Sequence, residues 1–69
     1  MTKKIKVEGM MCMHCEARVR DTLKAIEGVL TAAVDFRTGS ADVTLAKEIP
    51  DEVFKSEIEK QGYKVLGIE

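Results

Sequence analysis

The chain has 69 residues, 45% hydrophobic and 33% charged, which is enough for one small folded domain over residues 1–69 and too little for two. Its formal net charge is −1, and with only one Tyr and two Phe this composition argues against nucleic-acid binding. No segment is long and apolar enough for a secretion signal or a membrane span, so membrane insertion is not expected. Two cysteines without such a signal favour the reducing cytosol, where they remain thiols.

The first half of the chain is predicted to form a strand, a helix and a second strand. Residues 3–8 alternate between apolar and charged side chains, which predicts a strand. Residues 15–26 repeat apolar side chains at helical spacing, which predicts a helix that ends at Gly28. Glu16 and Arg20 lie four residues apart and are expected to pair on its surface. Residues 29–36 alternate again and predict a second strand.

The second half repeats this order. A turn signal at 37–40 leads to a third strand over 41–45. Pro50 suits the first residue of a second helix, which Gly62 is expected to end. The expected apolar stripe of this helix is Val53, Phe54, Ile58 and Gln61. Residues 63–68 predict a last strand whose inward face shifts near Leu66 and Ile68.

The order strand, helix, strand, strand, helix, strand predicts an α+β fold. It is the ferredoxin-like βαββαβ sandwich, with two helices on one face of a four-stranded antiparallel sheet. In this layout both cysteines, Cys12 and Cys15, fall in the first strand-to-helix loop, at a helix N-terminus. The loop at Gly62-Tyr63 could approach them from the other half of the fold.

The segment from Gly9 to Cys15 reads Gly-Met-Met-Cys-Met-His-Cys and carries the chemistry of the chain. Helix N-termini stabilise thiolates, so the pKa values of these thiols should be lowered. Two thiolates form a complete ligand set for Cu(I), whereas a structural zinc site needs four ligands. The chain has no second Cys pair and one His, so the pattern favours a soft monovalent ion.

A second chemistry remains open for the same pair. Cys-x-x-Cys at the start of a helix also occurs in thiol–disulfide oxidoreductases, which would make the chain an enzyme. Such enzymes present a proline to the disulfide, whereas the only proline here, Pro50, is expected to open a helix. The interpretation that we prefer is a metal-binding module that is not an enzyme.

The motif Gly9-Met10-x-Cys12-x-x-Cys15, followed by a helix and by Gly62-Tyr63 near the end of a βαββαβ pattern, resembles the heavy-metal-associated domain. The resemblance covers essentially the whole chain and is greatest to stand-alone bacterial copper chaperones of the CopZ type. It implies a cytosolic carrier that binds Cu(I) through both cysteines. It also implies transfer by thiolate exchange to a copper-transporting P-type ATPase, and a copper-linked homodimer. A carrier of another soft ion such as Hg(II), or one metal-binding domain of a transporter, remains an alternative.

The resemblance also assigns expectations to the residues around the pair. Met10 should be tucked inward and, with Gly9, support the loop. Met11 and Met13 should be exposed, as a soft contact patch or as thioether donors to the metal. His14 should point outward, as an accessory group, a third ligand or a plain solvated residue. Tyr63 is either a half-buried cap on the sheet or a ring that shields the thiolates, with Gly62 allowing its approach.

Overall fold

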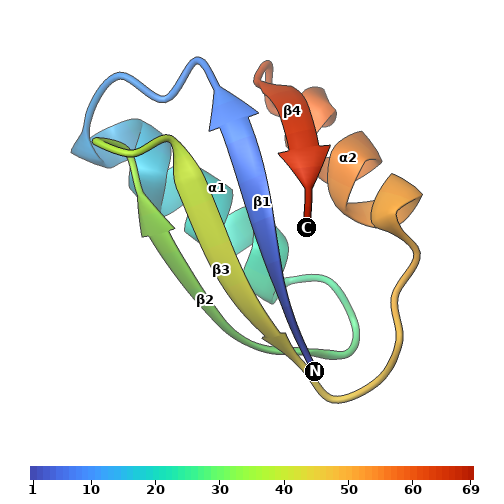
Figure 1. The fold of residues 1–69 in the computed structure, drawn as a ribbon. Coiled ribbons are helices and arrows are strands. Elements are labelled where there is room, and N and C mark those ends of the chain that lie inside the picture. Colours follow the sequence, from blue (N-terminus) through green and yellow to red (C-terminus); the bar gives the residue numbers. More distant parts are fainter.

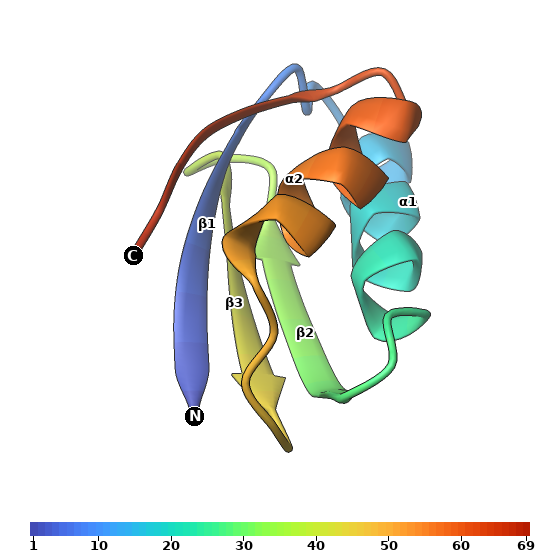
Figure 2. The same ribbon diagram turned by 90° about the vertical axis from the view of Figure 1, so that its right-hand side faces the viewer.

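The computed structural model describes all 69 residues and has the predicted element order. Its elements are β1 (Thr2–Glu8), α1 (Met13–Lys24), β2 (Val29–Asp35), β3 (Ser40–Leu45), α2 (Asp51–Lys60) and β4 (Lys64–Ile68). The strands form one antiparallel sheet in the order β2-β3-β1-β4 (Figure 1). Both helices lie on the same face of this sheet (Figure 2). The predicted ferredoxin-like α+β fold is therefore confirmed.

The core lies between the sheet and the two helices. The positions predicted to face inward are buried in β1 and β3 and half-buried in β2 and β4, and the helices contribute fully buried side chains such as Leu23 and Phe54. All eleven buried residues are hydrophobic: Ile5, Val7, Met10, Val19, Leu23, Ala41, Val43, Leu45, Ile49, Phe54 and Ile58. Apolar burial is thus the main stabilising contribution, and it holds α1 against β2 and α2.

Both helix boundaries differ from the prediction. The first helix begins at Met13 and ends at Lys24, so Gly28 closes a separate turn before β2 and does not end the helix. The second helix begins at Asp51, with Pro50 in extended backbone just before it. Gln61 follows this helix and is exposed, so it does not belong to the apolar stripe. Turn residues therefore mark the elements correctly, but the boundaries depend on hydrogen bonds that the pattern does not reveal.

The last strand contains the predicted change of face. The pairing of β1 with β4 shifts between Lys6 and Val7, so Val7 faces Val65 while Lys6 faces Gly67. Leu66 is the extra residue and stays 59% exposed. A bulge of this kind turns an edge strand, which also discourages pairing with other chains.

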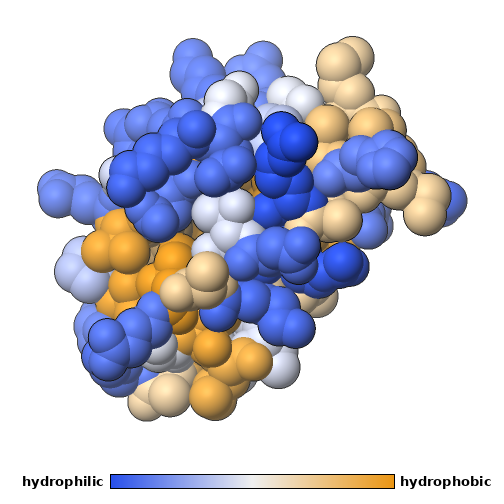
Figure 3. Space-filling view, turned by 180° about the vertical axis from the view of Figure 1, so that it is seen from behind, coloured by the Kyte–Doolittle hydropathy of each residue, from blue (hydrophilic) through white to orange (hydrophobic).

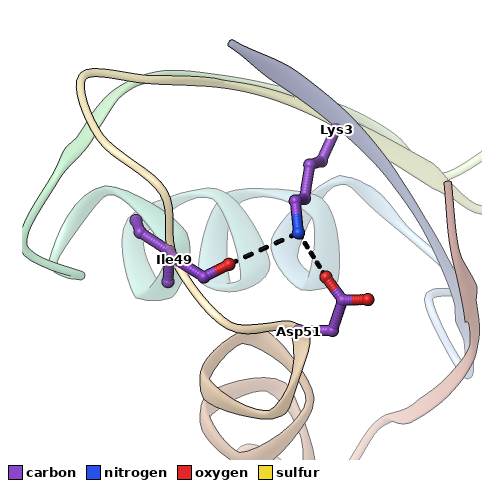
Figure 4. A network of polar contacts seen from close by, with 3 residues as sticks. All are labelled: Lys3, Ile49 and Asp51. Carbon is purple, nitrogen blue, oxygen red and sulfur yellow. Dashed lines mark hydrogen bonds and ion pairs between the residues drawn. The ribbon is translucent and has the colours of Figure 1, made fainter.

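A lysine connects the first strand to the start of the second helix. Lys3 donates a hydrogen bond to the carbonyl of Ile49 at 3.3 Å and forms an ion pair with Asp51 (Figure 4). Its side chain is 23% exposed, so the ammonium is partly removed from water. This contact holds the connection before α2 against β1, at the end of the sheet opposite the cysteines (Figure 1).

Neither helix has the length and apolar character needed to cross a membrane.

Candidate metal site

The two cysteines lie at the junction of the first loop and α1, as predicted. Cys12 is the residue just before the helix, in extended backbone, and is exposed. Cys15 is in the first turn of α1, half-buried and packed against the core. Their sulfur atoms lie 3.8 Å apart, and both cysteines are free thiols. One small ion can therefore reach both sulfurs from solvent.

Tyr63 lies beside this pair, after the end of α2. Hydrogen bonding from its hydroxyl to the Cys15 thiolate is the largest cause that lowers the pKa of Cys15 to about 7. A backbone hydrogen bond from Met11 acts in the same direction. The same contact with Cys15 raises the pKa of Tyr63. Tyr63 is half-buried and lies near the thiols, and the shielding of the thiolates by its ring stays a prediction.

The loop that carries the thiols is supported from below and from one side. Met10 is 8% exposed and belongs to the core, as predicted. Gly9 gives room to Tyr63, because a Cβ atom at Gly9 would lie 3.3 Å from the ring. Gly62 does not provide this room, since a Cβ atom there would meet nothing within 4 Å. Gly62 instead has a φ of +92° directly before Tyr63, a backbone conformation that favours glycine, so its expected part in the approach of the ring stays a prediction.

Soft side chains surround the thiols on the solvent side. Met11 and Met13 are 85% and 72% exposed, and His14 is exposed as well. The space-filling view shows moderately hydrophobic side chains gathered at the upper right, over this end of the molecule (Figure 3). More strongly hydrophobic side chains lie at the opposite, lower end. The methionines are placed where a partner surface or an incoming ion would meet them first.

Sequence reasoning missed the role of Glu16. Its carboxylate accepts a hydrogen bond at 3.1 Å from the backbone N–H of Phe36, in the turn between β2 and β3. The expected surface pair with Arg20 is absent, and Arg20 instead lies 3.9 Å from Asp21. Glu16 and Phe36 are twenty residues apart, so no local spacing rule could indicate this contact.

The site offers two thiols and little else that could hold a hard or four-coordinate ion. No group of three or more His, Cys, Asp or Glu side chains is arranged to hold a metal anywhere in the chain. A structural zinc site needs four such ligands. Two adjacent thiols, one with a lowered pKa, are instead suited to a soft ion of low coordination number.

Comparison with known proteins agrees with this geometry. The model of the heavy-metal-associated domain matches residues 4–64. The copper chaperone CopZ of Staphylococcus saprophyticus is 38% identical over 65 residues, which cover 93% of this chain and 96% of that protein. Copper-transporting ATPase 2 of Rhizobium meliloti is 35% identical over 65 residues, but the chain spans only 8% of its length. The CopZ relatives are named copper chaperones, in agreement with the expectation that the chain is not an enzyme.

Solved structures resemble the fold over its full extent. A CopZ metallochaperone superposes with a TM-score of 0.88 at 34% identity, covering 96% of this chain and all of that one. Oxidised MerP from Ralstonia metallidurans CH34 superposes with a TM-score of 0.88 at 26% identity, covering 100% of this chain and 96% of that one. The matched family model, the relatives at this identity and the shared fold lead to one conclusion: the chain belongs to the heavy-metal-associated domain family and is similar to CopZ-type copper chaperones.

Proposed function

We propose that this chain is a cytosolic copper chaperone that carries Cu(I) between the thiolates of Cys12 and Cys15. The observation that carries the proposal is the arrangement of the two thiols, 3.8 Å apart at the N-terminus of α1, with the pKa of Cys15 lowered to about 7. A thiolate that is already formed near neutral pH binds a soft metal without first losing a proton. The likeness to copper chaperones supports the choice of copper as the cargo.

Transfer to a partner follows from the exposure of the site. Cys12 is exposed and Cys15 is half-buried, so thiolates of a second protein can reach a bound ion from solvent. An ion held by only two ligands has room for a third, and the incoming thiolate can replace Cys12 before Cys15. We propose a metal-binding domain of a copper-transporting P-type ATPase as the recipient, because the chain is 35% identical to part of such an ATPase. The copper-linked homodimer stays a prediction, to be tested by ultracentrifugation with and without copper.

The test is an anaerobic Cu(I) titration of the reduced protein against a chromophoric Cu(I) chelator. We expect the wild-type protein to remove copper from the chelator in a 1:1 complex, and the Cys12→Ser/Cys15→Ser double variant to leave the chelator loaded. Mixing the loaded protein with a purified metal-binding domain of a copper ATPase should then move copper to that domain. Failure of the wild-type protein to compete for Cu(I) would refute the proposal.

The oxidoreductase alternative loses support from the position of the only proline. Pro50 lies just before α2, at the end of that helix away from Tyr63, and not at the entrance of a strand. Measuring the reduction of insulin by the protein tests this alternative directly, and we expect no activity.

Transport of Hg(II) is the remaining alternative. One structure with the same fold, at a TM-score of 0.79 and 27% identity, is the Hg(II) complex of the N-terminal domain of a mercuric reductase. Hg(II) also accepts two thiolates, so the pair alone does not select between the two ions. The presence or absence of copper sensitivity in a deletion strain, compared with mercury sensitivity, separates the two cargoes.

A further inference from the structure

The turn between β2 and β3, residues 36–39, contacts both ends of the loop that carries the cysteines. On the side where the loop leaves β1, the backbone N–H of Val7 donates to the carbonyl of Gly39 at 2.7 Å. On the side where the loop enters α1, the carboxylate of Glu16 accepts from the N–H of Phe36 at 3.1 Å. These two contacts join the end of β1 and the first part of α1, on either side of the metal loop, to one short segment.

The turn itself is well fixed. The carboxylate of Asp35 accepts a hydrogen bond from the N–H of Arg37 at 2.8 Å, and its carbonyl accepts one from Gly39 at 3.0 Å. The ring of Phe36 is half-buried and packs against the core. A segment held in this way can serve as a support for a neighbouring loop.

Glu16 is also tied to the metal loop through its own backbone. Its N–H donates to the carbonyl of Cys12 at 3.1 Å, and it directly follows Cys15. One residue thus joins the backbone of the first cysteine, the helical turn of the second and the β2–β3 turn. Its half-buried side chain, together with Met13 and Phe36, lines a hollow between α1 and the end of β2.

We propose that Glu16 is a positioning residue that holds the cysteine loop against the β2–β3 turn, so that Cys12 and Cys15 are already arranged for metal before it arrives. This inference rests on the proposed function as a copper carrier. Side chains that support metal ligands contribute to affinity because they remove the cost of ordering those ligands on binding.

The charge of Glu16 and its hydrogen bond to Phe36 have opposite expected effects on Cu(I) affinity. Glu16 directly follows Cys15, and a negative charge there would not favour thiolates, so loss of the charge alone would leave Cu(I) affinity unchanged or raise it slightly. Loss of the hydrogen bond to Phe36 would free the loop and lower the affinity. Glu16→Gln removes the charge but keeps an oxygen that can accept this bond, whereas Glu16→Ala removes both.

The experiment compares Glu16→Ala, Glu16→Gln and Asp21→Ala in the anaerobic chelator competition. Asp21→Ala is the matched control, because it removes an exposed carboxylate from the same helix without touching the turn. We expect Glu16→Ala to bind Cu(I) about tenfold more weakly, at the lower end of the range for residues that support metal ligands. Glu16→Gln and Asp21→Ala should stay within about twofold of the wild type. Equal affinities for Glu16→Ala and Glu16→Gln would overturn the inference.

A measurement without metal keeps the inference separate from the proposed function. Amide hydrogen exchange of the reduced apo protein should be faster at Phe36 and at residues 10–15 in Glu16→Ala, and unchanged in the centre of β1. Gly39→Ala tests the other contact, because a Cβ atom there would lie 3.1 Å from the carbonyl of Val7, and it should loosen the same loop. If wild type fails to bind Cu(I), the proposed function falls, and exchange alone decides on Glu16. Unchanged exchange at residues 10–15 in Glu16→Ala would refute the positioning role.

Discussion

Replacing Tyr63 by Phe should raise the pKa of Cys15 while leaving the fold unchanged. The hydrogen bond from the Tyr63 hydroxyl is the largest of the causes that lower this pKa from the usual 9.0 to about 7. Phe keeps the ring, and therefore the contact with Gly9, but removes the donor. Backbone hydrogen bonds from Met11 and Cys12 remain in the variant, so the pKa should rise toward 9.0 without reaching it.

The size of the effect depends on which property is measured. At pH 7 a thiol with a pKa of about 7 is about half ionised, whereas one with a pKa of 9.0 is only about 1% ionised. This is a difference of about 50-fold in thiolate. A thiolate of lower pKa is also less nucleophilic, by about six- to tenfold for a difference of two pKa units. The alkylation rate at pH 7 should therefore fall by at most about fivefold to eightfold in the variant, while the midpoint of the pH profile moves clearly.

The assay is the rate of iodoacetamide alkylation of the reduced apo protein between pH 5 and 10, with Cys12 and Cys15 resolved by peptide mass spectrometry. We expect the Cys15 midpoint near 7 in the wild-type protein and clearly higher in Tyr63→Phe. His14→Ala, which changes an exposed neighbour in the same turn, serves as the control and should keep the wild-type midpoint. An identical Cys15 midpoint in Tyr63→Phe and wild type would show that the hydroxyl does not stabilise the thiolate.

Three further predictions concern stability. Folding lowers the pKa of Cys15, so unfolding takes up a proton between pH 7 and 9. The urea midpoint of the reduced apo protein should therefore rise from pH 7 to pH 9. Cys15→Ser should abolish this rise. Phe54→Ala should lower the free energy of unfolding by about 3–5 kcal/mol in urea titrations, since Phe54 is fully buried, and a loss below about 1 kcal/mol would contradict the described core. Lys3→Met should lower the free energy of unfolding by about 1–2 kcal/mol in the same titrations, because it leaves the Ile49 carbonyl without its donor. Asp51→Asn should lower it by less than about 1 kcal/mol, because the ion pair with Lys3 is partly exposed. Equal losses in the two variants would contradict the hydrogen bond from Lys3 to Ile49.

The parts of the structure that sequence predicted are those that depend on local spacing. Alternation in residues 3–8 and 41–45 identified the buried faces of β1 and β3 because strand side chains alternate between the two faces of a sheet. Glycine and proline marked where elements change, yet α1 ended at Lys24, four residues before Gly28. The boundary was missed because a helix ends where its hydrogen bonds end, and the turn that follows has no distinct apolar pattern.

In the site, too, some features depend on local spacing and others depend on contacts between distant parts of the chain. The placement of Cys12 and Cys15 at the start of a helix followed from their spacing and from the strand before them. Tyr63 and Glu16 owe their positions to contacts across the fold, from the end of α2 to the loop and from α1 to the β2–β3 turn. Two thiols on a flexible loop outside a folded domain would have ordinary pKa values, and their sulfur atoms would adopt many different separations. The folded domain is therefore needed less to supply the ligands than to set the ionisation of Cys15 and the separation of the two thiols, and the variants at Tyr63 and Glu16 test these two contributions independently.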